Sequence, residues 1–294
     1  MRNNSHKHIN TKISTIMEVK SFEKEFLSEH PTKVFVLKPM REALNVTEVK
    51  WQDLTTLNLN RVKEHICSHV SPNTACWYLA VIKAFLGKYA DEGIVPCKNP
   101  AAQLKAKKVP SQHIALTEDE IERFDQYEPK TDCERDAKIL FMRGCYTGAR
   151  SSDCKLFTPD IIHGDHISYV SVKTKTEVVQ PLHRKLIKYL VVQPSKPHQS
   201  NALNAAIQRI CKAIGIDDEV QLYVGGKLRK GPKWQFVGLH TSRRSLVSNL
   251  ALRDVPIAVI SKIVGHQSTN TTSRYLCIDA RNVGDNAMAF FNGN

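Results

Sequence analysis

No run of apolar residues in this sequence approaches the ~18 that a membrane-spanning helix requires. The first ten residues, MRNNSHKHIN, are polar and lack the apolar stretch of a secretory signal. The chain also has no internal repeat and no low-complexity tract. Hydrophobic residues still make up 41% of its 294 residues, enough to fill a core, so wholesale disorder is excluded. These features favour a soluble, cytoplasmic protein.

Closely spaced cysteine pairs are missing as well. No two cysteines lie at the spacing of a zinc knuckle or a redox-active pair. Several, including Cys145 and Cys211, occupy apolar helical patterns in which a thiol packs as a small hydrophobic group. We therefore expect reduced, structural cysteines, no metal site and no cofactor. The eight cysteines are Cys67, Cys76, Cys97, Cys133, Cys145, Cys154, Cys211 and Cys277.

Acidic residues are in the minority: 29 Asp and Glu stand against 42 Lys and Arg, giving a net charge of +13 and a pI near 9.4. Residues 1–112 carry 17 basic and 10 acidic side chains, and residues 113–294 carry 25 and 19. Both halves are therefore basic, which excludes a neutral enzyme with a charged tail. Two basic halves suit a clamp around a polyanion whose counterions are released on contact. The alternative is a basic surface that only aids solubility.

The part before residue 97 is predicted to be all-helical. Helical patterns cover residues 18–30, ended by Pro31, and residues 60–70. The clearest helix begins at Ser71-Pro72, a cap residue followed by a proline in the first turn, and ends near Gly93. Residues 97–114 then combine two prolines and four lysines with no acid, which is the composition of a basic linker.

The part after this linker is predicted to be mainly helical with one small sheet, so the fold class is mainly α with a small β-sheet (α+β). Thr117 and Glu120 form a capping box that opens the first helix. Segments 161–172 and 178–182 alternate like short strands around a turn at 173–176. Further helices are expected over 137–146, 201–214, 241–253, 256–264 and 270–277. The expected organisation is a flexible arm (1–17), a helical domain (18–96), the linker (97–114), a mixed domain (115–277) and a C-terminal tail (278–294).

Five short stretches of the second part carry side chains suited to chemistry on a phosphate. They are TGARSSD (147–153), VKTKTEVVQPL (172–182), LHTSRRS (239–245), VGHQSTN (264–270) and TTSRYL (271–276). Taken singly, each is a weak signal. The candidate catalytic residues in these stretches are Arg150, Lys175, His240, Arg243, His266 and Tyr275.

In this order and spacing the residues resemble the catalytic set of the tyrosine recombinase (phage integrase) family. That set is an Arg after Thr-Gly, a Lys in a β-hairpin, His-x-x-Arg, Gly-His, and a Tyr nine residues after that His. The resemblance covers residues 116–280 in its motifs and extends loosely over the helical segment before them. It implies a helical core-binding domain and a catalytic domain that form a C-shaped clamp on DNA. Ser242 departs from the family pattern, which commonly has Leu there, and this puts the local packing in question.

The chemistry of these residue types agrees with the resemblance. Cutting a phosphodiester without a metal needs a nucleophile, compensation for phosphoryl charge and an acid for the leaving oxygen. Tyr275 is the expected nucleophile, because a phenol is both more acidic than a sugar hydroxyl and a better leaving group. Arg150 and Arg243 offer planar forks to phosphate oxygens. Lys175 is the expected general acid, with Lys173 as the alternative.

The remaining residues of this set are assigned supporting parts. His240 and His266 are expected to bind the phosphate or orient the tyrosine, and a metal pair is rejected because arginines would repel a cation. Asp153 orients an arginine or forms a plain helix salt bridge. Contacts with the DNA backbone are expected from Lys105, Lys107, Lys108, Lys173 and Arg274, and the basic stretch 225–234 is either a further contact loop or a solvated one.

The expected function is thus a site-specific DNA recombinase that cleaves and rejoins strands through a 3′-phosphotyrosyl bond at Tyr275. The resemblance implies double-stranded DNA with an inverted-repeat core site, a homotetramer on two DNA sites, and no membrane partner. A type IB topoisomerase and a catalytically silent DNA-binding regulator of the same fold stay open as alternatives. Apolar residues in the tail, such as Phe290 and Phe291, favour docking on a neighbouring protomer over folding back on their own domain.

Overall fold

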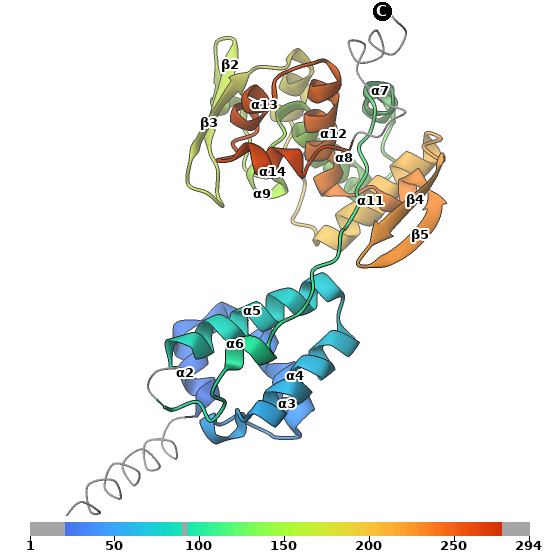
Figure 1. Cartoon of the computed structure of the whole chain (residues 1–294). Helices are drawn as coiled ribbons and strands as arrows, with labels where there is room; N and C mark the ends of the chain where they lie inside the picture. Colours follow the sequence, from blue (N-terminus) through green and yellow to red (C-terminus); the bar gives the residue numbers. More distant parts are fainter. Residues whose placement is uncertain (1–20, 90–92, 278–294) are drawn as a thin grey trace, which may run out of the picture. The chain divides into compact units, whose positions relative to one another are not determined.

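The computed structural model describes residues 21–89 and 93–277 (Figure 1). The predicted arm (1–17) and tail (278–294) lie outside these residues. The chain divides into two compact units, one of residues 1–111 with 223–227 and the other of residues 112–222 with 228–294. No helix in the described part combines the length and the apolar character needed to cross a bilayer.

Within the first unit, the described residues between 21 and 104 fold into helices and 3₁₀ turns joined by short connections. Its core contains a cluster of aromatic rings: Phe22 and Phe85 pack edge-on with ring centroids 5.5 Å apart, and Trp51 lies 5.2 Å from Phe22. Ser71 caps α5 as predicted, its side chain accepting a hydrogen bond from Thr74 N. The helices are α2 (Phe22–Glu29), α3 (Leu37–Leu44), α4 (Thr56–His69), α5 (Pro72–Lys88) and α6 (Pro100–Gln103), with 3₁₀ turns at Pro31–Val36 and Trp51–Asp53.

The stretch with linker composition contributes to both units. Cys97 and Leu104 are buried in the core of the first unit, and Ile114 is buried in the core of the second. Between them, residues 105–113 form neither helix nor strand and expose all three of their lysines. The charged composition thus marks the connecting chain, whereas the apolar residues at its two ends anchor it.

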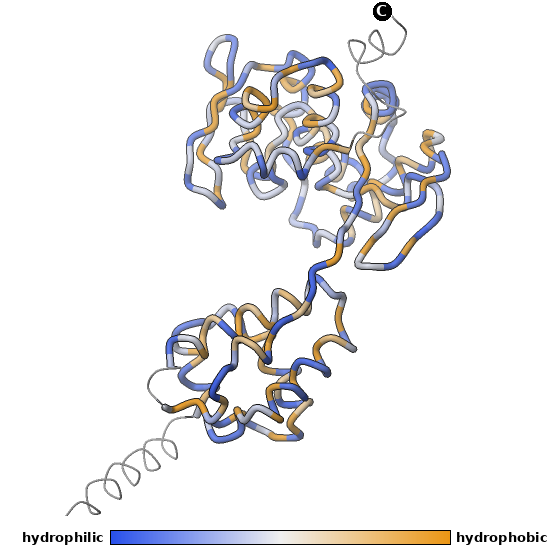
Figure 2. The backbone as a smooth tube through the Cα atoms, viewed as in Figure 1, coloured by the Kyte–Doolittle hydropathy of each residue, from blue (hydrophilic) through white to orange (hydrophobic). Residues whose placement is uncertain are grey.

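The second unit surrounds a long buried helix, α8, with shorter helices, a small sheet and most of a β-hairpin whose turn, residues 223–227, belongs to the first unit. Its helices are α7 (Glu118–Gln126), α8 (Asp132–Thr147), α9 (Ser151–Cys154), α10 (Ile187–Leu190), α11 (Ser200–Ala213), α12 (Leu239–Leu252), α13 (Ile257–Ile263) and α14 (Thr269–Ser273), with 3₁₀ turns at Pro159–Ile161, Arg184–Leu186 and Lys233–Phe236. Apolar residues recur along these helices, as expected for elements with one buried face (Figure 2). The predicted class, mainly α with a small β component, is confirmed.

The sheets differ from the prediction in number. One is the expected antiparallel sheet, β1 (Ile162–His163), β2 (His166–Val170) and β3 (Glu177–Pro181), in which Ser168 pairs with Val179. The other is a hairpin of β4 (Glu219–Val224) and β5 (Lys227–Pro232). The prediction of a single sheet was therefore wrong, because the basic stretch 225–234 was taken for a loop. The Gly225-Gly226 pair, both with positive φ, is the hairpin signal in that stretch.

Two local features place the site residues. Helix α12 packs closely on α8, and Ser242 of α12 fits against Gly144 of α8, where an added Cβ would lie 2.9 Å from Ser242 Cβ. The Ser242 hydroxyl donates to Leu239 O at 2.6 Å, so the departure from the family's Leu produces a close, satisfied helix contact. At Gly265 (φ 65°) an added Cβ would lie 2.5 Å from Val178 of β3, so only glycine allows the turn that presents His266.

Candidate active site

Tyr275 lies directly after α14, with its hydroxyl 3.0 Å from His240 Nε2 on the first turn of α12. The two rings are 5.2 Å apart, and the His266 ring is 4.8 Å from Tyr275. Arg243 places its guanidinium carbon 5.4 Å from the tyrosine ring centroid. The start of α12 and the stretch 266–275 thus meet around one phenol.

Arg243 is held by carbonyl groups of two turns. Its side chain is 1% exposed, and its two terminal nitrogens donate to Gly148 O and to Val264 O, the latter at 2.8 Å. Its Nε is buried and has no hydrogen-bond partner in the described part of the chain. Two backbone carbonyls therefore hold the guanidinium in place, and its Nε–H is left without an acceptor among the described residues.

His266 has one partnered and one unpartnered nitrogen. Its Nδ1 lies 2.9 Å from Thr272 Oγ1, and Thr272 Oγ1 lies 2.6 Å from Ser261 Oγ. Its Nε2 is buried and makes no hydrogen bond within residues 21–89 and 93–277. Buried polar atoms without partners are rare in folded proteins and call for an explanation.

Both histidines are neutral at pH 7 in the free protein. Desolvation by the protein atoms around the rings, reinforced by the charges of nearby arginines, lowers the pKa of His240 and of His266 to about 4. For His240 the largest charge effects after desolvation come from Arg244 and Arg243. Arg150 contributes to the shift at both rings, which places its charge in the same neighbourhood.

Arg150 is tied to the β2–β3 hairpin through Ser171. Its Nη1 donates to Ser171 Oγ at 3.1 Å, and that hydroxyl donates to Asp153 Oδ2 at 3.2 Å. Asp153 also accepts from Val172 N at 2.9 Å. The aspartate therefore acts on the arginine through a serine hydroxyl. This agrees with the prediction that Asp153 orients an arginine, whereas the alternative, a helix salt bridge of Asp153, is not found among the described residues.

Lys173 and Lys175 are exposed on the hairpin turn, and within the described residues neither side chain bonds to the other five predicted catalytic side chains. Lys175 has a left-handed backbone (φ 55°), which is uncommon for a residue other than glycine. Its N–H donates to Ser171 O at 2.8 Å, so the residue that contacts Arg150 also fixes the backbone of Lys175. This link distinguishes Lys175 from Lys173.

The predicted DNA-contact residues are exposed. Arg274 precedes the tyrosine, and its carbonyl accepts a hydrogen bond from Arg244 Nη1 at 2.9 Å. Lys105, Lys107 and Lys108 lie along the connecting segment. One member of the basic stretch is engaged elsewhere, because Lys233 pairs with Glu120 at 2.6 Å beside the α7 capping box.

Three residues of the site were missed by the sequence reasoning. Ser171 joins Arg150 to the hairpin, Thr272 contacts His266, and Arg244 lies 5.0 Å from the Tyr275 ring centroid. Ser268 caps α14, its side chain accepting a hydrogen bond from Asn270 N, and Thr271 and Thr272 lie inside the helix.

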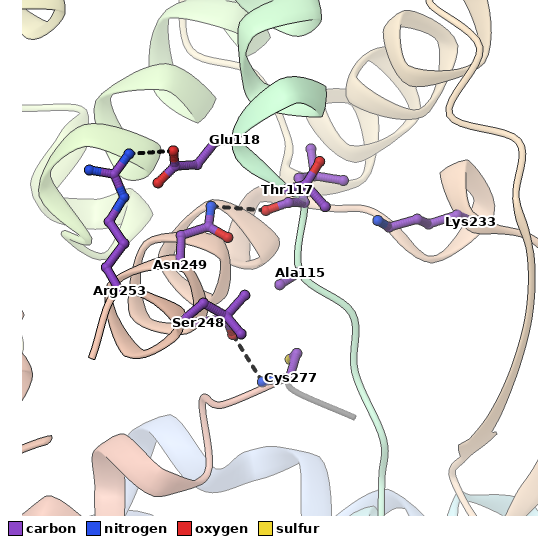
Figure 3. Close-up of a pocket in the computed structure, with 10 residues that line it drawn as sticks. Ala115, Thr117, Glu118, Lys233, Ser248, Asn249, Arg253 and Cys277 are labelled. Carbon is purple, nitrogen blue, oxygen red and sulfur yellow. Dashed lines mark hydrogen bonds and ion pairs between the residues drawn. The ribbon is translucent and has the colours of Figure 1, made fainter. Parts of the chain in front are cut away.

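A separate pocket of about 260 Å³ lies in the second unit, away from these residues (Figure 3). It is lined by residues 115–118 and by the C-terminal half of α12, where Arg253 pairs with Glu118. Cys277, the last described residue, donates its N–H to Ser248 Oγ at 2.9 Å at the pocket edge. None of the predicted catalytic residues lines this pocket.

The fold is that of the tyrosine recombinases, enzymes that break and rejoin DNA. The model of the phage integrase family matches residues 115–281, more than half of the chain, and the chain belongs to that family. The protein is a site-specific tyrosine recombinase.

Individual relatives agree with this assignment. Tyrosine recombinase XerC of Thermodesulfovibrio yellowstonii is 25% identical over 246 residues, covering 76% of this chain and 77% of the relative. A lambda integrase dimer bound to a COC′ core site matches at a TM-score of 0.61 and 16% identity, over 94% of this chain and 95% of that one. A lambda integrase tetramer bound to a Holliday junction also matches at 0.61 and 16%, over 93% and 78% of the two chains.

Proposed function

We propose that Tyr275 is the nucleophile of this recombinase and that the other five residues bind and activate the scissile phosphate. The observation that carries the proposal is the pair of unpartnered nitrogens, Arg243 Nε and His266 Nε2, buried beside a phenol that is already hydrogen-bonded to His240. A phosphodiester placed there would supply oxygen acceptors to both. Its negative charge would also offset the arginine charges that lower the histidine pKa values.

The bond changes follow from this arrangement. The Tyr275 oxygen attacks phosphorus and the bond to the 5′ oxygen breaks, leaving a 3′-phosphotyrosyl link. The phenol proton passes to His240, which is neutral before attack and lies at hydrogen-bond distance. Lys175 gives a proton to the departing 5′ oxygen, and Arg150 and Arg243 stabilise the charge on the non-bridging oxygens. Rejoining is the same sequence in reverse, so no external energy source is needed.

The DNA partner is proposed to be a duplex with an inverted-repeat core site, enclosed by the two basic units as a C-shaped clamp and bound by a homotetramer on two sites. The exposed lysines 105, 107 and 108 between the units, together with Lys173 and Arg274, would contact its backbone. The similar lambda integrase structures, one on a core site and one a tetramer on a Holliday junction, support this assembly. The bacterial relative supports action on DNA in a bacterial cytoplasm.

The test uses a nicked duplex built from the inverted repeats that flank the gene. Wild-type protein should form a covalent adduct that survives denaturing electrophoresis, and Tyr275→Phe should bind the duplex with unchanged affinity and form none. Tyr223→Phe, on the exposed face of β4, is the matched control and should form adduct normally. An adduct with Tyr275→Phe would refute the assignment of the nucleophile. No adduct with wild type would favour the silent regulator, and relaxation of supercoils without exchanged products would favour the topoisomerase.

A further inference from the structure

Thr272 contacts both the nucleophile and the second histidine. Its hydroxyl lies 2.9 Å from His266 Nδ1, and its backbone carbonyl accepts the Tyr275 N–H at 2.8 Å. The Thr272 side chain is fully buried, and Ser261 of α13, whose hydroxyl completes the chain at 2.6 Å, is 5% exposed. Water therefore has little access to these three polar groups. Each of their protons must find its acceptor within the group of three.

Only one arrangement of protons satisfies the hydrogen bonds among Ser261, Thr272 and His266. A hydroxyl has one proton to donate, and a neutral imidazole carries a proton on one of its two nitrogens. If His266 Nδ1 carried it, Thr272 would have to donate to Ser261, and the Ser261 proton would be left without an acceptor among the described residues. If Ser261 donates to Thr272 and Thr272 donates to Nδ1, every hydroxyl proton is used.

The second arrangement also decides what His266 offers to a ligand. With Nδ1 accepting from Thr272, the ring proton resides on Nε2, the buried nitrogen that has no partner in the described structure. A donor is what a phosphate oxygen requires, whereas a bare nitrogen lone pair would repel it. His240, by contrast, meets the tyrosine hydroxyl through its own Nε2 and can act as the acceptor.

We infer that Thr272, supported by Ser261, is a positioning residue that holds His266 as the Nε2–H tautomer and fixes it relative to Tyr275. The inference rests on the proposed role of His266 at the phosphate. Ser261–Thr272–His266 form a relay in which the threonine hydroxyl sets the ring and the threonine carbonyl sets the start of the tyrosine segment. One residue thereby places the nucleophile and a phosphate donor together.

The tautomer can be measured without any DNA. Ring ¹⁵N spectra of the full-length protein at pH 7.5, with the His266 signals assigned through His266→Gln, should show a protonated Nε2 and an unprotonated, hydrogen-bonded Nδ1. In Thr272→Val the Nδ1 signal should move toward that of an unbonded ring nitrogen, and in Thr272→Ser it should stay. A protonated Nδ1 in the wild-type protein would overturn the inference whatever the activity of the enzyme.

Single-turnover cleavage of the nicked duplex gives the second readout. Thr272→Val should slow adduct formation roughly 10-fold, the effect of one lost buried hydrogen bond, without changing DNA affinity. Thr272→Ser should restore most of the rate, and Ser261→Ala should show a smaller loss. Thr271→Val, the same change one residue away, is the control and should cleave normally. Equal rates for Thr272→Val and wild type would contradict the inference, whereas a wild type without any adduct would contradict the proposed function instead.

Discussion

Replacing Gly144 with alanine should destabilise the protein and slow cleavage together. Alanine favours a helix over glycine by about 1 kcal/mol, so an uncrowded glycine in α8 would gain stability from the change. Here the new methyl group would lie 2.9 Å from Ser242 Cβ and closer still to its hydroxyl. Rotating the hydroxyl away would break its bond to Leu239 O and leave the Cβ contact in place. The two helices must therefore move apart, at a cost of about 2–3 kcal/mol, the upper part of the range for an overpacked core, because a Cβ contact cannot be relieved by side-chain rotation.

The displacement would reach the site because α12 carries His240 and Arg243, and Arg243 is held by the Gly148 carbonyl at the end of α8. Urea unfolding should show a net loss of about 1–2 kcal/mol, and adduct formation should fall in parallel. The double variant Gly144→Ala/Ser242→Gly removes both crowded atoms of the serine. It should show a favourable coupling energy and regain part of the cleavage rate. A Gly144→Ala protein as stable as wild type would refute the close contact between α8 and α12.

Two further predictions concern the lysines. Lys175→Ala should slow cleavage of ordinary DNA and spare a substrate with sulfur at the 5′-bridging position, because a thiolate leaves without a proton. If the sulfur substrate instead rescues Lys173→Ala and not Lys175→Ala, the general acid is Lys173. Changing Lys105, Lys107 and Lys108 together to Gln should weaken binding of DNA and make the slope of log affinity against log salt shallower by about 0.9 for each phosphate that the variant no longer neutralises. An unchanged slope in a salt titration would remove these lysines from the interface.

Local signals in the sequence predicted local structure well. The capping box of Thr117 and Glu120 is present, with both of its reciprocal hydrogen bonds, and Ser71 caps α5 as expected. Each of these features depends on residues within one turn of helix, where side-chain chemistry and backbone geometry are directly linked. The motif spacing likewise led to the family, because spacing along the chain needs no knowledge of packing.

Contacts between distant segments were not predictable in this way. Ser171 is important because it lies between Arg150 and Asp153, about twenty residues away, and nothing in the hairpin sequence marks it. Arg244 and Thr272 matter only because α12 and α14 meet around Tyr275. Such residues are ordinary in sequence and become significant through tertiary packing, which a pattern along one chain does not encode.

The central claim is that Tyr275 forms the covalent bond with DNA, and mass spectrometry of the trapped adduct tests it most directly. After proteolysis and nuclease digestion, the peptide that contains Tyr275 should carry a single nucleotide attached through its 3′ phosphate to the tyrosine oxygen. The Arg243→Lys variant should give the same modified peptide in much lower yield, because lysine cannot replace the planar guanidinium held by the Gly148 and Val264 carbonyls. A nucleotide found on any other residue, or attached through a 5′ phosphate, would contradict the account.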